Sequence, residues 1–351
     1  MKKYILFLTA ACLLGSLFTS CKNDEPADDG ILDTDYDVWI INEGQWQYNN
    51  ASLTAYNSHS QKTSGDFFAA CNKRGLGDVA NDILVYGSKA YIAVNLSSTV
   101  EIVRTSDGKS LQQLSFFNGK TASQPRRLCA GDGKVFVCCY DGSVHRIDTA
   151  ALEVEASGTA GSNPDGICLN GGKLYVSNSG GMNYPVYDST LSVMDAQSLQ
   201  TIRTIRVRCN PSRALSDAYG HVWVMSSGNY TDIFGCLQCI DAASDSVVAV
   251  FEEALADFDI CGSKAYLLCY GNQSAVCKSI DAVNFKTELL FEKSGCTAIY
   301  AINCRPADGS IWITDALDYM SKGNVYAFDA QGQQKHFFEA GICPKRVVFP
   351  K

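Results

Sequence analysis

The sequence is poor in histidine and has no excess of positive charge. Only 4 of its 351 residues are histidine, and His59, His145, His221 and His336 show no His-x-His or His-Glu-x-x-His spacing. A zinc-hydrolase site needs such clustered ligands. A Gly-x-Ser-x-Gly elbow is also missing. Acidic residues (37) outnumber basic ones (29), so the net charge is −8 and the surface repels phosphate backbones. These features argue against a zinc hydrolase, an elbow-type serine hydrolase and a nucleic-acid-binding protein.

Long apolar runs are equally scarce. The run near the start, Tyr4 to Leu17, follows Lys2 and Lys3 and is too short to cross a bilayer as a helix of the mature protein. A positive start, an apolar stretch and closing small residues are typical of a signal peptide. The sequence therefore predicts a signal peptide over residues 1–20. The composition, 46% hydrophobic and 19% charged, predicts a folded body rather than a disordered chain.

The residues that end this segment predict a lipid anchor. Phe18-Thr19-Ser20-Cys21 resembles a bacterial lipobox, in which the Cys21 thiol carries the acyl chains. Residues 21–34 are then a lipidated, acidic and flexible tether, because they lack apolar periodicity. The acidic run after Cys21 also resembles the surface-export signal of Bacteroidetes lipoproteins. We expect an outer-membrane protein that contacts the membrane through this anchor only and faces the cell exterior; a periplasm-facing lipoprotein stays open.

Residues 35–351 repeat one phrase, a Gly-containing turn followed by an aromatic residue in an alternating apolar run. Gly133-Lys134-Val135-Phe136-Val137 and Gly172-Lys173-Leu174-Tyr175-Val176 are two examples. The repeated aromatics are Trp39, Tyr91, Phe136, Tyr175, Trp223, Tyr266 and Trp312. Their spacing of about 40 to 50 residues is the period of a four-stranded propeller blade. The sequence therefore predicts seven blades.

A second phrase, with proline in its second position, predicts how the ring closes. Gln124-Pro125-Arg126 and Asn163-Pro164-Asp165 precede aromatic strands and are typical of a blade's innermost strand. The phrase returns at the C-terminus as Cys343-Pro344-Lys345, while the strand around Trp39 has none before it. The C-terminal strand is therefore expected to complete the first blade, which removes open sheet edges. We predict an all-β, seven-bladed β-propeller with four-stranded antiparallel blades, in a single monomeric domain.

Three stretches of the chain carry a family resemblance. Ile41 to Trp46, Arg74 to Asp82 and Tyr175 to Gly181 resemble most specifically the YncE-like, surface-layer-type seven-bladed propeller lipoproteins of gut Bacteroidetes. Some members of that family capture corrinoids (vitamin B12) at the cell surface and pass them to a TonB-dependent transporter, whereas others have no assigned ligand. The resemblance implies a surface ligand-binding lipoprotein with a corrinoid as ligand and such a transporter as partner.

Four predicted connections between the second and third strands of a blade are long, and they predict the binding face. They run from Glu43 to Ala51, Ser179 to Thr190, Ser226 to Gly235 and Asp315 to Gly323. Tyrosine, tryptophan and asparagine there supply contact area and paired hydrogen-bonding groups. The alternative is that these loops are tolerated insertions that cover the blade ends. The candidate ligand-binding residues are Trp46, Tyr48, Asn49, Arg74, Asp82, Asn95, Arg127, Tyr140, Asn178, Asn183, Tyr184, Tyr187, Arg213, Asn229, Tyr230, Tyr270, Asp315, Tyr319 and Arg346.

Equivalent positions on the predicted innermost strands form a charged ring. Counting from the repeated turns gives Arg346, Asp82, Arg127, Gly166, Arg213, Asp257 and Asn303. Two interpretations remain open. The ring is either an ion-pair network that closes the central channel, since buried charges need partners, or a polar floor whose arginines bind ligand carbonyls or phosphate.

Cysteine is plentiful, with 16 residues, of which 14 remain after Cys12 is lost with the signal peptide and Cys21 is lipidated. Cys236-Leu237-Gln238-Cys239 has a redox or zinc spacing, but an odd separation on a strand sends the two thiols to opposite faces. We expect mostly buried, inert thiols, with one or two cross-strand disulfides open.

The predicted function is ligand capture without chemical transformation, with no catalytic residue, metal or cofactor. A glycan is the alternative ligand, because sugar faces stack on tryptophan and tyrosine. A calcium-dependent, lactonase-like hydrolase is third. Asp82, Asp257, Asn178 and Asn303 would offer its oxygen ligands, but three arginines in the same ring would repel the cation.

Overall fold

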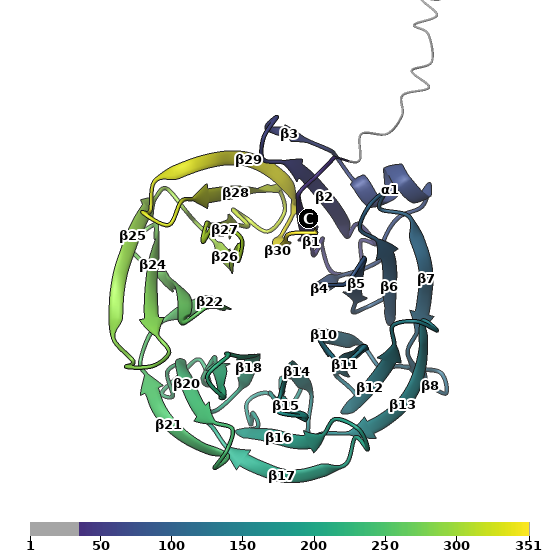
Figure 1. Cartoon of the computed structure of the whole chain (residues 1–351), viewed down its shortest axis with the longest axis vertical. Coiled ribbons are helices and arrows are strands. Elements are labelled where there is room, and N and C mark those ends of the chain that lie inside the picture. The colour runs from purple at the N-terminus through teal and green to yellow at the C-terminus, as the bar shows by residue number, and fades with distance from the viewer. Residues whose placement is uncertain (1–34, 351) are drawn as a thin grey trace, which may run out of the picture. The chain divides into compact units, whose positions relative to one another are not determined.

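The computed structural model describes residues 35–350, which form a ring of seven four-stranded antiparallel sheets (Figure 1). The predicted seven-bladed β-propeller is thereby confirmed. The predicted signal peptide, Cys21 and the tether lie outside the described residues, so these stay predictions. In each blade, strands a, b, c and d follow one another from the ring axis outward.

The strands of each blade have the following bounds. Blade 1 contains β30 (Pro344–Val348), β1 (Val38–Asn42), β2 (Ser52–Asn57) and β3 (Lys62–Thr63), and blade 2 contains β4 (Ala80–Tyr86), β5 (Lys89–Val94), β6 (Thr99–Arg104) and β7 (Ser110–Ser115). Blade 3 contains β10 (Pro125–Gly131), β11 (Lys134–Cys139), β12 (Ser143–Asp148) and β13 (Glu153–Thr159), and blade 4 contains β14 (Pro164–Asn170), β15 (Lys173–Asn178), β16 (Thr190–Asp195) and β17 (Thr201–Arg206). Blade 5 contains β18 (Pro211–Ser216), β19 (His221–Ser226), β20 (Cys236–Asp241) and β21 (Ser246–Phe251). Blade 6 contains β22 (Leu255–Cys261), β23 (Lys264–Tyr270), β24 (Ser274–Asp281) and β25 (Thr287–Ser294), and blade 7 contains β26 (Ile299–Cys304), β27 (Ile311–Asp315), β28 (Lys322–Phe328) and β29 (Gln334–Ile342).

The C-terminal strand closes the ring as predicted. β30 pairs antiparallel with β1, with Trp39 opposite Val348 and Ile40 opposite Val347. The first blade therefore combines the two ends of the described chain. Because a closed ring leaves each inner strand between two neighbours, this pairing protects an edge that would otherwise be exposed.

The seven repeated aromatics lie on strand b of each blade and pack against the next blade. Trp39 of blade 1 clusters with Ile83 and Ile92 of blade 2. Trp312 of blade 7 clusters with Ile40 of blade 1. The same holds for Tyr91, Phe136, Tyr175, Trp223 and Tyr266, each of which packs with buried residues of the following blade. The repeat that revealed the fold is therefore the packing contact between blades.

Two elements depart from the regular repeat. Between blades 1 and 2 lies α1 (Phe67–Asn72), which begins after Asp66, whose carboxylate accepts a hydrogen bond from Ala69 N. It buries Phe67 and Phe68 against blade 1, where the outer strand β3 has only two residues. The second is a hairpin of β8 (Phe117–Asn118) and β9 (Thr121–Ala122) before blade 3. A helix of six residues is too short to give an apolar periodicity in the sequence.

The cysteines of residues 35–350 are all free thiols, 14 in number, and most are buried. Burial raises the pKa of the Cys236 thiol to about 11 and that of Cys239 to about 12, so both behave as small apolar groups. Within the same residues, no helix has the length and apolar character needed to cross a bilayer.

Candidate functional site

One face of the ring carries the connections between strands b and c; we call it the mouth face. The predicted long loops are confirmed, since β1–β2, β15–β16, β19–β20 and β27–β28 are joined by residues 43–51, 179–189, 227–235 and 316–321. The other three b–c connections, residues 95–98, 140–142 and 271–273, are short. Long loops on one face of a rigid scaffold are where binding residues are usually found.

Exposed apolar side chains concentrate on the mouth face. Of the twenty exposed large hydrophobic side chains in the described residues, eleven lie in these loops or at the strand end leading into one: Trp46, Tyr48, Met182, Tyr184, Val186, Tyr230, Ile233, Phe234, Tyr270, Tyr319 and Met320. Only Tyr219 and Val283 lie in turns of the opposite face. Apolar side chains gathered on one side of a soluble protein often mark a surface that binds a ligand or partner.

Several of these tyrosines contact one another across blades. The rings of Tyr184 and Tyr187 meet edge to face at 6.2 Å between centroids, and Tyr187 meets Tyr230 of the next blade at 6.0 Å. Tyr319 and Tyr300 of blade 7 meet in the same way at 5.8 Å. Burial, together with Tyr319 and Tyr230, raises the pKa of Tyr270. Phenol groups from blades 4 to 7 therefore lie around one side of the channel mouth.

Two of the exposed tyrosines are held in a backbone conformation that bulky residues seldom adopt. Tyr230 and Tyr319 both have φ of 61°, in the left-handed region. Such a residue costs free energy that the rest of the fold must supply, and positions of this kind cluster at functional sites. The tight turns of the opposite face also use this conformation, at Leu152, Leu199 and Phe285, so it does not by itself mark a site.

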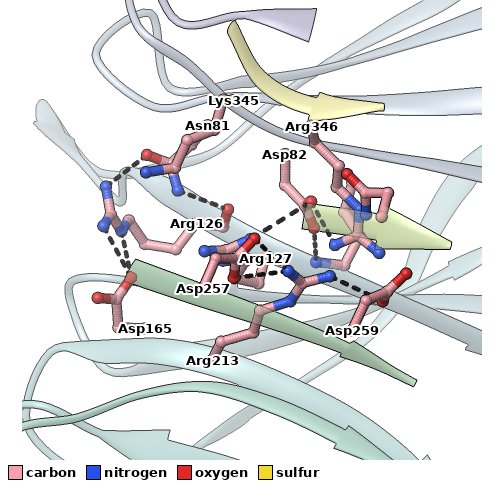
Figure 2. A network of polar contacts seen from close by, with 12 residues as sticks. Asn81, Asp82, Arg126, Arg127, Asp165, Arg213, Asp257, Asp259, Lys345 and Arg346 are labelled. Carbon is pink, nitrogen blue, oxygen red and sulfur yellow. Dashed lines mark hydrogen bonds and ion pairs between the residues drawn. The ribbon is translucent and has the colours of Figure 1, made fainter. Parts of the chain in front are cut away.

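Just below the tyrosines lies a first layer of polar side chains at the start of the innermost strands. Arg126 donates through Nη1 to the side-chain oxygen Oδ1 of Asn81 at 2.6 Å and through Nε to the Asp165 carboxylate at 2.8 Å (Figure 2). Its guanidinium also lies 4.3 Å from the centroid of the Tyr140 ring. Burial and Asp165 raise the pKa of the Tyr140 phenol, so the hydroxyl stays protonated at neutral pH.

The same layer continues on blades 7 and 1. Tyr300 donates a hydrogen bond to the Glu43 carboxylate, and Lys345 lies 4.2 Å from the centroid of the Tyr300 ring. Lys345 Nζ is also 3.9 Å from Glu43 Oε2. The mouth is thus lined by Arg–Tyr and Lys–Tyr pairs whose charges are balanced by neighbouring carboxylates.

Further along the innermost strands from the mouth face, the predicted charged ring is present, and its arginines pair mostly with its aspartates. Arg213 Nη1 binds both carboxylate oxygens of Asp257 at 2.6 Å, and its Nη2 binds Asp259 at 3.1 Å. Arg346 Nη1 binds Asp82 at 2.8 Å, and Arg127 Nη1 lies 3.8 Å from the same oxygen (Figure 2). A cavity of about 10 Å³, room for no more than one water molecule, lies beside Asp82, Arg127, Arg213 and Arg346. The pairing of the arginines with aspartates favours the interpretation of the ring as an ion-pair network of the fold.

The register corrects one member of that ring. In each innermost strand, the pairing with strand b shifts register near the start of the strand. In blades 2 and 3, the first residue that pairs after this shift is the ring residue, Asp82 or Arg127. In blade 7 that residue is Ala301. Asn303 lies two residues further along, where its Oδ1 accepts a hydrogen bond from Val347 N. It therefore connects blades 7 and 1 below the ring.

Several predicted ligand residues are used by the fold instead. Asn178 is buried and binds Gly161 N, Thr190 Oγ1 and Ser192 Oγ; Asp315 is buried and accepts from Thr297 N, Ala298 N and Leu317 N. Asn95 binds Pro125 O, and Asn229 accepts the amides of its own loop. Arg74 forms an ion pair of 2.8 Å with Glu101 on β6 and binds Ser110 on β7, the two outer strands of blade 2. Asn178, Asp315 and Asn229 use both polar atoms of their side chains in these bonds, whereas Arg74 and Asn95 use one of theirs.

Other predicted residues do lie exposed on the mouth face. Trp46, Tyr48, Asn49, Asn183, Tyr184, Tyr230, Tyr270 and Tyr319 are exposed there, and Tyr140 and Tyr187 are half-buried beside them. The first polar layer, Asn81, Arg126, Asp165, Tyr300 and Lys345, was not predicted. The irregular pairing lets two consecutive residues, such as Arg126 and Arg127, both contribute to the channel lining, which a strict alternation forbids.

Within residues 35–350, no three His, Cys, Asp or Glu side chains are grouped in a way that could hold a metal ion. The oxygen ligands considered for calcium do not meet, because Asn178 is bound within blade 4, while Asp82 and Asp257 are paired with arginines.

The fold and this face define the chain as a seven-bladed propeller with an ion-paired ring in its channel and aromatic side chains on its mouth face. Residues 36–250 match the family described as a domain of unknown function, DUF5074, and the chain belongs to that family. No curated protein sequence matches it.

Two solved structures share the architecture. A quinoprotein alcohol dehydrogenase-like protein from Bacteroides thetaiotaomicron is similar with a TM-score of 0.66 and 14% identity, over 91% of this chain and 79% of that one. The hydrazine synthase of Kuenenia stuttgartiensis is similar with a TM-score of 0.56 and 18% identity, over 69% of this chain and 74% of that one. At such identities the likeness concerns the fold alone.

Proposed function

We propose that this protein is a cell-surface lipoprotein that captures a ligand on its mouth face without transforming it, and that the ligand is a corrinoid passed to a TonB-dependent transporter. The observation that supports the proposal is the concentration of exposed tyrosines from four blades around the channel mouth, above the ion-paired ring. A broad flat molecule would contact several of these rings at once.

The chemistry of the mouth face suits a corrinoid. Such a molecule presents a flat ring bordered by amide arms, and the tyrosine rings supply flat contact area at low entropic cost. At the base of the mouth, Arg126 and Asp165 already pair with each other and would lie beneath the ligand as a polar surface. The lipid anchor and the transporter come from the lipobox-like Cys21 and from the family resemblance of the sequence.

The proposal is tested by titrating cyanocobalamin into a form that begins at residue 30 and following the absorbance of the corrin. Saturable binding at micromolar concentration or tighter supports it. The matched control is an exposed tyrosine of the opposite face: Tyr219→Ala should bind as the parent does, whereas Tyr319→Ala, which removes an equally exposed ring (51% in both), should bind more weakly.

A glycan is the second candidate, favoured by the exposed Trp46 and its neighbour Tyr48, because sugar faces stack on such rings. Absence of cyanocobalamin binding together with a signal on a glycan array, lost in Trp46→Ala, would replace the corrinoid by a glycan. Calcium-dependent hydrolysis of a lactone would overturn both binding proposals.

A further inference from the structure

Two of the free thiols meet at the boundary between blades 6 and 7. Cys261 ends β22 and Cys304 ends β26, the innermost strands of these two blades. Asp259, two residues before Cys261, accepts a hydrogen bond from Cys304 N at 2.9 Å. Asp257 accepts one from Ile302 N in the same way, at 3.1 Å. These bonds between the blades hold the end of β26 beside the end of β22.

The two sulfur atoms are in contact. The Cys304 thiol donates a hydrogen bond to the Cys261 sulfur, and the Tyr266 hydroxyl of β23 donates one to the Cys304 sulfur. Because the sulfur atoms of a disulfide are about 2 Å apart, thiols that already hydrogen-bond to each other need only a short approach to form the bond. The geometry therefore favours a covalent link between two neighbouring blades.

The two thiols differ in how well they can be reached and ionised. Cys261 is half-buried, whereas Cys304 is buried. Burial raises the pKa of both thiols, and the hydrogen bond from Cys304 partly offsets this rise at Cys261. Since the thiolate is the reactive form, an oxidant from solvent meets the better nucleophile first at Cys261. Cys304 lies directly behind it as the second thiol.

We propose that Cys261 and Cys304 form a disulfide bond between blades 6 and 7 when the chain meets an oxidant of the disulfide class. The signal peptide predicted from the sequence would direct the chain to a compartment in which such bonds form and persist. The bond concerns the scaffold, so it does not rest on the proposed ligand. It also selects one pair from the cross-strand disulfides that the sequence left open.

The reaction is an exchange in two steps. The Cys261 thiolate attacks one sulfur of the oxidant, which releases one thiolate and leaves a mixed disulfide on Cys261. Cys304 then loses its proton and attacks the Cys261 sulfur, which releases the second thiolate. The two protons of the cysteines end on the two released thiolates. Two protein thiols are thereby oxidised, and the oxidant is reduced to two thiols.

The test begins with the folded full-length chain, incubated with oxidised glutathione. The remaining thiols are then alkylated under denaturing conditions, and the peptides are mapped by mass spectrometry. The expected result is a pair of peptides joined through Cys261 and Cys304. Alkylation of both residues, a link to other cysteines instead, or glutathione left on Cys261 as a mixed disulfide would overturn the proposal.

Thermal unfolding gives a second readout. The bond joins two strands that are separated in sequence by most of blade 6, so it restricts the unfolded chain. Oxidation should raise the Tm of the parent by about 5 °C or more, and a reducing agent should reverse the rise.

Two variants locate the effect. Cys261→Ser should lose both the linked peptides and the rise in Tm. Cys209→Ser is the matched control and should keep both, because Cys209 is also half-buried but its thiol is hydrogen-bonded with Ser189. An equal rise in Tm in Cys261→Ser and the parent would contradict the proposal. If Cys261→Ser fails to fold, the peptide map of the parent decides by itself.

Discussion

The two faces of the ring are built from the same strands but end them differently. On the face opposite the mouth, an aspartate at the end of strand c, or just after it, closes a tight turn by accepting backbone amides; Asp148, Asp195, Asp241, Asp281 and Asp329 all do so. On the mouth face, four of the seven b–c connections are long and present aromatic side chains. One face is therefore specified by local turn chemistry, and the other is free to vary around a fixed frame.

The comparison separates residues that stabilise the fold from residues that are exposed for contact with a ligand. Turns of the opposite face satisfy themselves within a few residues and expose little apolar surface. The mouth face exposes tyrosines and stands above a buried ionic network. The following variants distinguish a loss of stability from a loss of ligand binding, and they run from the largest expected effect to the smallest.

The largest loss of stability is expected from the channel floor. Asp257→Ala leaves the buried Arg213 without its bidentate partner and Ile302 N without an acceptor, and should lower the free energy of unfolding by about 3–5 kcal/mol. Urea unfolding measures it. Asp281→Ala, on the opposite face of the same blade, should lose far less, and equal losses would show that the floor is no more important than a turn.

A smaller loss of stability is expected at Asn178, which the sequence predicted to contact the ligand but which the fold uses for its own hydrogen bonds. Asn178→Ala leaves Gly161 N without its acceptor and should cost about 1–3 kcal/mol. Because the side chain is buried, ligand affinity should stay within the error of the titration. A clear loss of affinity at unchanged stability would return Asn178 to the binding site.

On the mouth face itself, the effect should appear in binding and not in stability. Tyr319→Ala is expected to weaken cyanocobalamin binding by about tenfold or more, the effect of removing one aromatic contact residue. The unfolding midpoint should change little, because the side chain is 51% exposed and alanine keeps the Cβ atom that makes a φ of 61° unfavourable. Calorimetry alongside the titration separates the two readouts.

The smallest effect is expected on the stability of the Asp148 turn at low pH. The amide of Ala151, with Lys134, lowers the pKa of Asp148 from 3.8 to about 2. The turn's contribution to stability is therefore fully present above about pH 4 and is lost as the pH falls toward 2. Asp148→Asn should reduce the change of Tm between about pH 4 and pH 2. If Tm falls with pH as steeply as in the parent, Asp148 does not contribute to the acid sensitivity of the fold.

The architecture was predictable because its signal is repeated. The seven aromatics mark the same contact between neighbouring blades, and the returning Cys343-Pro344 phrase revealed the strand that completes blade 1. Repetition averages out local exceptions, so even the blade with an outer strand of two residues was counted correctly.

The site was less predictable because its residues break the repeat. Irregular pairing at the start of β10 brings Arg126 into the channel lining beside Arg127, and the same irregularity in β26 puts Ala301, not Asn303, in the ring. Asn178 and Asp315 are residue types that often contact ligands, but here they accept hydrogen bonds from backbone amides of their own fold. Composition cannot tell an amide that is already bonded from one that is free.

The most direct test of the account is amide hydrogen exchange of the chain with and without saturating cyanocobalamin. The account predicts slower exchange in residues 227–235 and 316–321 of the mouth face, and no change in the c–d turns of the opposite face. Protection confined to those turns, or no protection anywhere on the ring, would contradict it.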